Sequence, residues 1–276
     1  MTDQPSLSLN DGHAMPQFGL GVWQMAEDET DRLVGQAIQA GYRAVDTAKI
    51  YGNEAGVGRA VRDTEETIFV TTKLWNADQG YDKALRAFDQ SFQTLGLDWI
   101  DLYLIHWPVP QAELYTETWK ALVRLKEEGR VRSIGVSNFT IETLERIIDD
   151  TGVVLAVNQI ECHPTFQQVE LRAWHEANGI ATTSWSPLGR GAELKDPVIA
   201  AVAEKHGRTP AQVTLRWHLD NGLIAIPKSA SPQRQQENLQ TLDFRLDEED
   251  LKRMAALDSP DGRTGPDPAT FAMGLD

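Results

Sequence analysis

The sequence contains a single cysteine, Cys162, among its 276 residues. An internal disulfide is therefore excluded, and so is a metal site built from several cysteines. Long apolar runs are also missing, since the longest one, Val198–Ala203, falls far short of the ~18 residues that a membrane-spanning helix needs. The first residues do not show the basic segment followed by an apolar one that marks a secretory leader. We therefore expect a cytoplasmic protein that has no membrane partner.

Basic residues are scarce relative to acidic ones. The chain has 26 Lys and Arg against 41 Asp and Glu, which gives a net charge of −15. A surface of this sign repels nucleic acid and anionic lipid, so we expect neither as a partner. A small anionic ligand can still bind where a local group of cations outweighs the overall field.

The length and the 41% hydrophobic content suit one large α/β domain. No linker rich in Pro, Gly or Ser divides the middle of the chain, so we predict a single domain over residues 1–276. Short apolar runs alternate with amphipathic helical stretches, which favours a parallel sheet with crossover helices. The predicted strands are Tyr42–Thr47, Thr67–Thr72, Ile100–His106, Val131–Ser137, Leu155–Ile160, Ile180–Ser184 and Leu223–Pro227. With a weak eighth candidate near Glu237–Leu239, they fit a closed (β/α)8 TIM barrel.

An open doubly wound sheet is the alternative fold. Such a sheet usually carries a glycine fingerprint for dinucleotides directly after its first strand. The nearest match here, residues 56–61, lacks the third glycine and lies inside a helix-like stretch. We interpret these glycines as a site of close helix packing.

Turn-forming residues gather at both ends of the chain. Residues 7–22 alternate in polarity around Asn10–Gly12, which predicts a β-hairpin ahead of the first barrel strand. Such a hairpin is placed to plug the bottom of the barrel. The tail after Leu257 is rich in Gly, Pro and Asp, so we expect an irregular segment that crosses the top or the bottom of the barrel.

Titratable side chains follow three consecutive predicted strands. Asp46 ends the first strand, with Tyr51 in the loop behind it, Lys73 ends the second strand and His106 ends the third. The carboxyl ends of barrel strands form the active-site face, so these four residues are expected to converge on one rim. Each of them has an ordinary structural explanation when taken alone, and it is their combination that indicates a site.

The chemistry of these four side chains suits a general acid for a carbonyl oxygen. A free phenol has a pKa too high for efficient donation at neutral pH, and a nearby ammonium group is expected to lower the pKa of Tyr51. Asp46 would hold the Lys73 ammonium in place, and His106 would orient the carbonyl. One carboxylate with one histidine offers too few ligands for a metal, so we predict no metal site. No G-x-S-x-G stretch that would mark an activated serine occurs.

A carbonyl that gains a proton must also gain a hydride, which requires a cofactor. Lys228 ends the seventh predicted strand, Ser231 and Pro232 are typical of a helix start, and Arg234 falls in the first turn. Two cations at a helix N-terminus after this strand predict a clamp for a cofactor phosphate.

Several long motifs follow one another in a fixed order along nearly the whole chain. They are DTAKIYGNE, TTKLW, LGLDWIDLYLIHWP, GVSNF, VNQIECHP, SWSPLG and IPKSASPQRQQEN. In these motifs the chain resembles the aldo-keto reductase family, and most of all the prokaryotic branch that includes 2,5-diketo-D-gluconate reductases and methylglyoxal reductases.

This resemblance implies a (β/α)8 barrel that uses NADPH to reduce aldehydes or ketones to alcohols. Tyr51 would be the proton donor, Lys73 and Asp46 would tune it, and His106 would orient the carbonyl. Trp185 would stack on the nicotinamide ring. The remaining cofactor contacts implied by the family are Gly21, Val22, Trp23, Asp46, Ser137, Asn138, Gln159, Ser186, Leu188, Lys228, Ser229, Arg234, Glu237 and Asn238.

The family also implies where the substrate binds. Trp23, Trp75 and Trp107, with His106, would line an apolar pocket for small aldehydes, α-dicarbonyls such as methylglyoxal, and keto sugars. The loop after His106 and the C-terminal tail are both short, which indicates an open pocket. We expect the protein to act as a monomer.

Two other functions are compatible with a barrel of this kind. A regulatory module would bind NADPH with almost no turnover, whereas an unrelated barrel hydrolase or isomerase would not bind NADPH. The presence of all four catalytic residue types favours the reductase.

Overall fold

The computed structural model describes residues 4–274. Its main sheet has eight parallel strands whose spatial order follows the chain. Bridges join Phe18 to Ala225 and Gly21 to Lys228, so the first strand meets the last. The sheet therefore closes into the predicted (β/α)8 barrel, and the open doubly wound alternative is wrong. The strands are β3 (Leu20–Gly21), β4 (Ala44–Asp46), β5 (Phe69–Leu74), β6 (Ile100–Ile105), β7 (Val131–Ser137), β8 (Val157–Glu161), β9 (Ala181–Trp185) and β10 (Ile224–Ala225).

The eighth strand is not where the sequence pattern placed it. Glu237–Leu239 belongs to a helix that begins after Ser231, whose hydroxyl accepts a hydrogen bond from the Arg234 amide. The missing strand is β3, near the N-terminus, where the Gly19 amide donates to the Ala225 carbonyl at 3.0 Å. Two residues are too few to show any periodicity, so this strand could not be recognised as part of the barrel.

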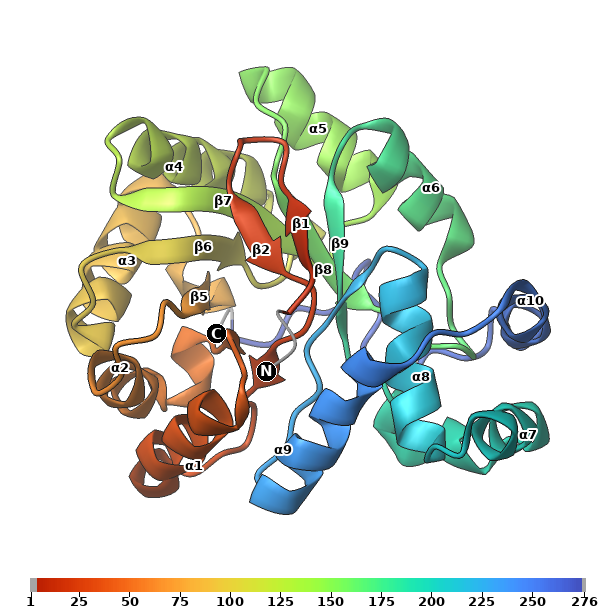
Figure 1. Ribbon diagram of the computed structural model, residues 1–276. Coiled ribbons are helices and arrows are strands. Elements are labelled where there is room, and N and C mark those ends of the chain that lie inside the picture. Colours follow the sequence, from red (N-terminus) through yellow and green to blue (C-terminus); the bar gives the residue numbers. More distant parts are fainter. Residues whose placement is uncertain (1–3, 275–276) are drawn as a thin grey trace.

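Ten α-helices in the described residues surround the barrel, as Figure 1 shows. α8 illustrates the local causes: Thr209 and Gln212 form a reciprocal capping box and Pro210 occupies the first helical position. None of these helices is long and apolar enough to cross a membrane. The helices are α1 (Glu27–Ala40), α2 (Glu54–Arg62), α3 (Tyr81–Leu95), α4 (Tyr115–Glu127), α5 (Ile141–Thr151), α6 (Val169–Ala177), α7 (Pro197–His206), α8 (Pro210–Asp220), α9 (Pro232–Leu239) and α10 (Glu248–Ala255).

The glycines of residues 56–61 lie within α2 and serve helix packing. A Cβ atom added to Gly58 would lie 1.9 Å from the Leu95 carbonyl oxygen at the end of α3. Only glycine permits this approach of the two helices, which confirms the interpretation made from the sequence.

The N-terminal hairpin covers one end of the barrel. β1 (Ser6–Ser8) pairs antiparallel with β2 (Ala14–Pro16), and Figure 1 shows the hairpin lying across the strands. Leu9 and Met15 are buried in one cluster with Phe69 and Leu102, near the amino ends of their strands. The predicted plug is therefore present, and the functional face must be the opposite end of the barrel.

Candidate active site

A buried ion pair lies at the carboxyl ends of β4 and β5. The Lys73 ammonium donates to Asp46 Oδ1 at 2.5 Å and to the Thr47 carbonyl at 2.8 Å, and the lysine side chain has no exposed area. Burial lowers the pKa of Lys73, while the neighbouring Asp46 raises it and partly offsets that effect. The ammonium is therefore held at one fixed position under the cavity floor.

Tyr51 stands above this ion pair. It ends a short 3-10 turn, Lys49–Tyr51, and Gly52 follows with a left-handed φ of 68°. The turn is tied down by Asn53, which accepts from the Thr47 hydroxyl at 2.8 Å and donates to the Val22 carbonyl at 2.9 Å. The Lys73 nitrogen is 5.2 Å from the centre of the Tyr51 ring.

The expected lowering of the Tyr51 pKa is wrong for this structure. Burial first and the Asp46 carboxylate second raise the pKa of the phenol above its usual value. Lys73 does not reverse this direction, because Asp46 neutralises the ammonium at close range. Tyr51 is therefore a neutral phenol that keeps its proton at physiological pH.

His106 faces Tyr51 from the end of β6. Its ring lies 5.8 Å from the Tyr51 ring and 5.3 Å from the Trp75 ring, both edge to face. Burial, followed by the nearby Lys73 charge, holds the pKa of His106 well below its usual value, so the imidazole is neutral. A neutral imidazole can donate one hydrogen bond to a carbonyl without competing for its proton.

Amide and hydroxyl side chains form a connected network on the other side of the cavity. Gln159 Nε2 donates to Asp46 Oδ2 at 2.8 Å. Ser137 donates to the Gln159 carbonyl at 2.8 Å, and Asn138 Nδ2 donates to the Ser137 hydroxyl and the His106 carbonyl, both at 3.0 Å. The Trp185 indole donates to Asn138 Oδ1 at 2.7 Å. These bonds fix the orientation of each amide and link the wall to the ion pair.

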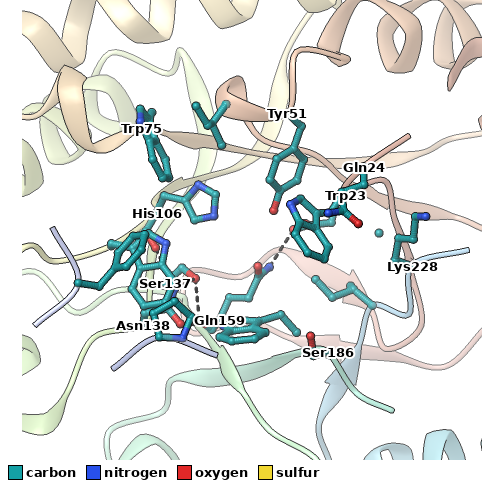
Figure 2. A pocket seen from close by; sticks show the side chains of 18 of the residues that line it. Trp23, Gln24, Tyr51, Trp75, His106, Ser137, Asn138, Gln159, Ser186 and Lys228 are labelled. Carbon is teal, nitrogen blue, oxygen red and sulfur yellow. Dashed lines mark hydrogen bonds between the residues drawn. The ribbon is translucent and has the colours of Figure 1, made fainter. Parts of the chain in front are cut away.

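Asp46, Tyr51, His106 and the amide network line one cavity of about 470 Å³, whereas Lys73 is buried outside its lining and reaches the site through its ion pair with Asp46. In Figure 2, Tyr51 and Trp75 lie on one side of it, while Gln159 and Ser186 lie on the opposite side. The predicted site residues that line the cavity are Gly21, Trp23, Asp46, Tyr51, Trp75, His106, Trp107, Ser137, Asn138, Gln159, Trp185, Ser186 and Lys228.

The other predicted cofactor residues lie beyond the cavity lining. Val22 is fully buried behind Gly21, and Leu188 packs against the core. Ser229 accepts from the Ser231 amide at the start of α9. Their roles stay predictions, together with those of the α9 residues Arg234, Glu237 and Asn238.

The cavity also contains residues that sequence reasoning missed. Gln24 and Arg190 follow recognised motifs directly, so their position in the chain was an available signal. The C-terminal tail crosses the top of the barrel, where the ring of Phe271 lies 4.3 Å from the ring of Trp107. Irregular tails carry no periodicity from which such contacts can be predicted. The missed residues are Gln24, Ile50, Arg190, Ile226, Pro266, Phe271 and Met273.

Cations lie at one edge of this acidic molecule's cavity. Lys228 is exposed at the cavity wall and Arg234 is exposed in the first turn of α9. Neither side chain forms an ion pair with another described residue. Two cations beside a helix N-terminus are the donor set that a phosphate group requires.

The chain is similar to known proteins of one family. The family model described as "Aldo/keto reductase family" matches residues 15–259, so the chain belongs to the aldo/keto reductase family. An aldo-keto reductase of Mycolicibacterium smegmatis is 54% identical, over 97% of this chain and 98% of that protein. A methylglyoxal reductase DkgA of Yersinia pestis is 49% identical, over 98% of this chain and 99% of that protein.

A solved structure has the same fold. A mutant of Gox0644 in complex with NADPH is 57% identical to this chain, with a TM-score of 0.95 over 97% of this chain and 98% of that one.

Proposed function

We propose that this protein is an NADPH-dependent oxidoreductase that reduces aldehyde and ketone carbonyls to alcohols. The observation that carries the proposal is the placement of Tyr51 above the Lys73–Asp46 ion pair and opposite a neutral His106, in one cavity of an aldo/keto reductase barrel. The complex of Gox0644 with NADPH supports the choice of cofactor.

Tyr51 is the proton donor in this proposal. Its raised pKa keeps the phenol protonated until a carbonyl oxygen beside it develops negative charge. The Lys73 ammonium then stabilises the phenolate that remains, because it lies 5.2 Å from the ring. His106 donates a hydrogen bond to the same oxygen and fixes its direction.

NADPH supplies the hydride when it is bound. Asn138 and Gln159, with the Ser137 hydroxyl, offer donors and acceptors that suit the amide of a nicotinamide ring, and Trp185 offers an aromatic face. Gly21, Val22, Trp23, Ser186 and Leu188 surround this end in the proposal. Lys228, Ser229 and Arg234 would hold the 2′-phosphate, with Glu237 and Asn238 at the adenine.

The substrate is a small carbonyl compound, such as a small aldehyde, methylglyoxal or a keto sugar. Trp23, Trp75 and Trp107 leave few polar groups on the substrate side, and Phe271 adds to the apolar wall. The relatives named methylglyoxal reductase support α-dicarbonyls as part of this range.

We also propose that the chain is one domain over residues 1–276, acts as a monomer and resides in the cytoplasm. Light scattering after size exclusion would test the oligomeric state. A dimer mass at micromolar concentration would contradict it.

The direct test of the function is the loss of NADPH absorbance with methylglyoxal, 2,5-diketogluconate and an aromatic aldehyde. Turnover with any of them is expected, and their ranking identifies the preferred carbonyl. Tight NADPH binding without turnover would favour the regulatory module instead. The reductase is favoured over that module because Asp46, Tyr51 and His106 line one cavity and Lys73 is paired with Asp46 directly behind it.

A further inference from the structure

A second cluster of charged groups lies beside the cavity and takes no part in the proposed chemistry. Glu161 is the last residue of β8 and is 1% exposed. Its carboxylate accepts hydrogen bonds from the Thr264 amide at 2.7 Å and from the Gly265 amide at 3.0 Å. The Thr264 hydroxyl donates to it at 2.5 Å. These donors all come from the segment 258–274, here called the strap.

His163 links this carboxylate to a different loop. Its Nε2 lies 3.3 Å from Glu161 Oε1 and its Nδ1 lies 3.1 Å from Glu193 Oε2. Glu193 belongs to residues 186–196, here called the β9 loop, and the histidine is fully buried. Burial lowers the pKa of His163, but its contacts with Glu161 and Glu193 outweigh burial and raise this pKa to about 9. His163 is therefore an imidazolium that donates to Glu161 at the end of β8 and to Glu193 in the β9 loop.

The strap and the β9 loop are both walls of the reaction cavity. The strap contributes Phe271 and the β9 loop contributes Arg190. The strap also touches the proposed nicotinamide platform, because a Cβ added to Gly265 would lie 2.3 Å from the Trp185 ring. The charged cluster therefore sits behind the walls and holds each of them at a separate point.

We propose that Glu161 is a positioning residue that holds the strap against Trp185. His163 connects Glu161 to Glu193 and thereby holds the β9 loop in place as well. The inference rests on the proposed function in one respect, namely that these walls enclose the carbonyl substrate. A buried carboxylate is costly unless each of its lone pairs has a partner. Because Thr264 and Gly265 supply most of the donors to Glu161, releasing the strap would leave this buried carboxylate with His163 alone, so the docked position of the strap is favoured.

The test compares Glu161→Gln with Asp101→Asn. Glutamine keeps the shape but loses the charge and brings an N–H group against the strap amides. Asp101 is a matched control, since it is also a buried carboxylate that accepts from a backbone amide and an arginine, Val70 and Arg132. It lies outside the lining of the reaction cavity.

We expect Glu161→Gln to accelerate hydrogen exchange at Thr264 and Gly265 by about tenfold or more, the effect of losing hydrogen bonds to a charged group. The KM for methylglyoxal should rise by about tenfold while kcat stays within about threefold, because the proton donor is untouched. Asp101→Asn should change neither quantity. A folded Glu161→Gln protein with wild-type exchange and KM would overturn the proposal.

The Glu193→Gln variant tests the β9 loop independently of the strap. It should accelerate exchange in the β9 loop and weaken NADPH binding, with little change at Thr264. Equal effects on both segments would contradict separate anchoring points.

If Glu161→Gln does not fold, Thr264→Val removes one donor to the same carboxylate from a half-exposed position and should raise exchange at Gly265. If the wild-type protein turns over no carbonyl, the proposed function fails while the exchange measurements still decide the role of Glu161.

Discussion

Tyr51 shows how the surroundings of a single side chain decide its chemistry. The sequence indicated a phenol beside an ammonium group, and that pairing alone would predict a lowered pKa. In the structure the ammonium is already paired with Asp46, and burial raises the pKa of the phenol instead. A donor of this kind releases its proton only to a strongly developed negative charge, which favours reaction at the carbonyl over exchange with water.

Replacing Tyr51 by phenylalanine should therefore abolish most turnover. We expect Tyr51→Phe to lower kcat by about 10²–10⁴-fold, the usual contribution of a positioned general acid. The ring and its packing remain, so the Kd for NADPH should change by less than about twofold. Stopped-flow turnover and fluorescence titration measure the two quantities. A near-normal kcat would remove Tyr51 from the role of proton donor.

A substitution at Arg234 tests whether the protein prefers NADPH to NADH. Arg234→Ala should weaken NADPH binding by about 10–100-fold, the worth of hydrogen bonds to a charged group, while NADH binding changes little. Arg146→Ala on the exposed face of α5 is the matched control for loss of one positive charge. Equal weakening of both cofactors would mean that Arg234 does not contact the 2′-phosphate.

Much of the site could be predicted because strand ends and motifs mark it directly. Asp46 and Trp185 end β4 and β9, each within one residue of the strand ends predicted from the sequence, Thr47 and Ser184. The wall supplied by Phe271 could not be predicted, since an irregular tail reaches its position through hydrogen bonds to residues far away in the chain. The Asn76 side chain, for example, donates to the Met273 carbonyl at 2.9 Å.

Among the helices, the contact between α2 and α3 depends on Gly58, which has no side chain. Gly58→Ala should destabilise the protein by about 1–3 kcal/mol, because the new methyl group meets the Leu95 carbonyl and the helices must separate. Gly35→Ala in α1 is the control: nothing lies within 4 Å of its added Cβ atom, so it should stabilise by about 0.5–1 kcal/mol. Urea unfolding measures both. A neutral Gly58→Ala would show that the helices relax at no cost.

The anchors of the strap and the β9 loop should respond to pH. The pKa of His163 is raised from 6.5 to about 9, so its contribution is complete below pH 6.5 and is lost as the pH rises through about 9. The pKa of Glu161 is lowered from 4.5 to about 2, so its contribution is complete above pH 4.5 and is lost as the pH falls through about 2. The titratable groups that face His163 are Glu161, Glu193 and His218. Arg172 acts on His218, and Arg263 stacks over Phe166, whose ring lies 6.2 Å from the His163 ring.

The KM for methylglyoxal should therefore rise above about pH 9 in the wild-type protein. Glu161→Gln should show a high KM that varies little over the same range. Burial also lowers the pKa of Lys73. Loss of the Lys73 proton would change kcat but not KM, so it can be distinguished from loss of the His163 proton. A wild-type KM that stays constant through this range would mean that His163 does not support the walls.

Strand prediction succeeded where a strand is long enough to show its pattern. Val131–Ser137 was predicted with the bounds that β7 has, and the other six predicted strands overlap their counterparts. β3 has two residues and is defined by its partners rather than by its own composition. The segment near Glu237–Leu239 has a helical cap at Ser231, and this local signal outweighed the weak strand pattern.

On the scale of the whole molecule, stability and function occupy opposite ends of the barrel. Met15 of β2 is 2% exposed and packs under the strands, whereas every predicted catalytic residue lies at their carboxyl ends. Met15→Ala should cost about 2–5 kcal/mol of unfolding free energy through lost burial and the cavity left behind. The kcat should stay within about twofold at a temperature where the variant is folded. A large loss of kcat in the folded variant would show that the two ends are coupled.

The seam between β3 and β10 has a consequence for biosynthesis. It is closed by bridges from Phe18 to Ala225 and from Gly21 to Lys228, so the first barrel strand to be synthesised cannot pair at this edge until the last one has been made. Until then the growing chain holds a curled sheet with two open edges, and such edges pair readily with other chains. Nascent copies are therefore most vulnerable to aggregation late in translation, and the interval that demands chaperone protection ends only when residue 228 has emerged.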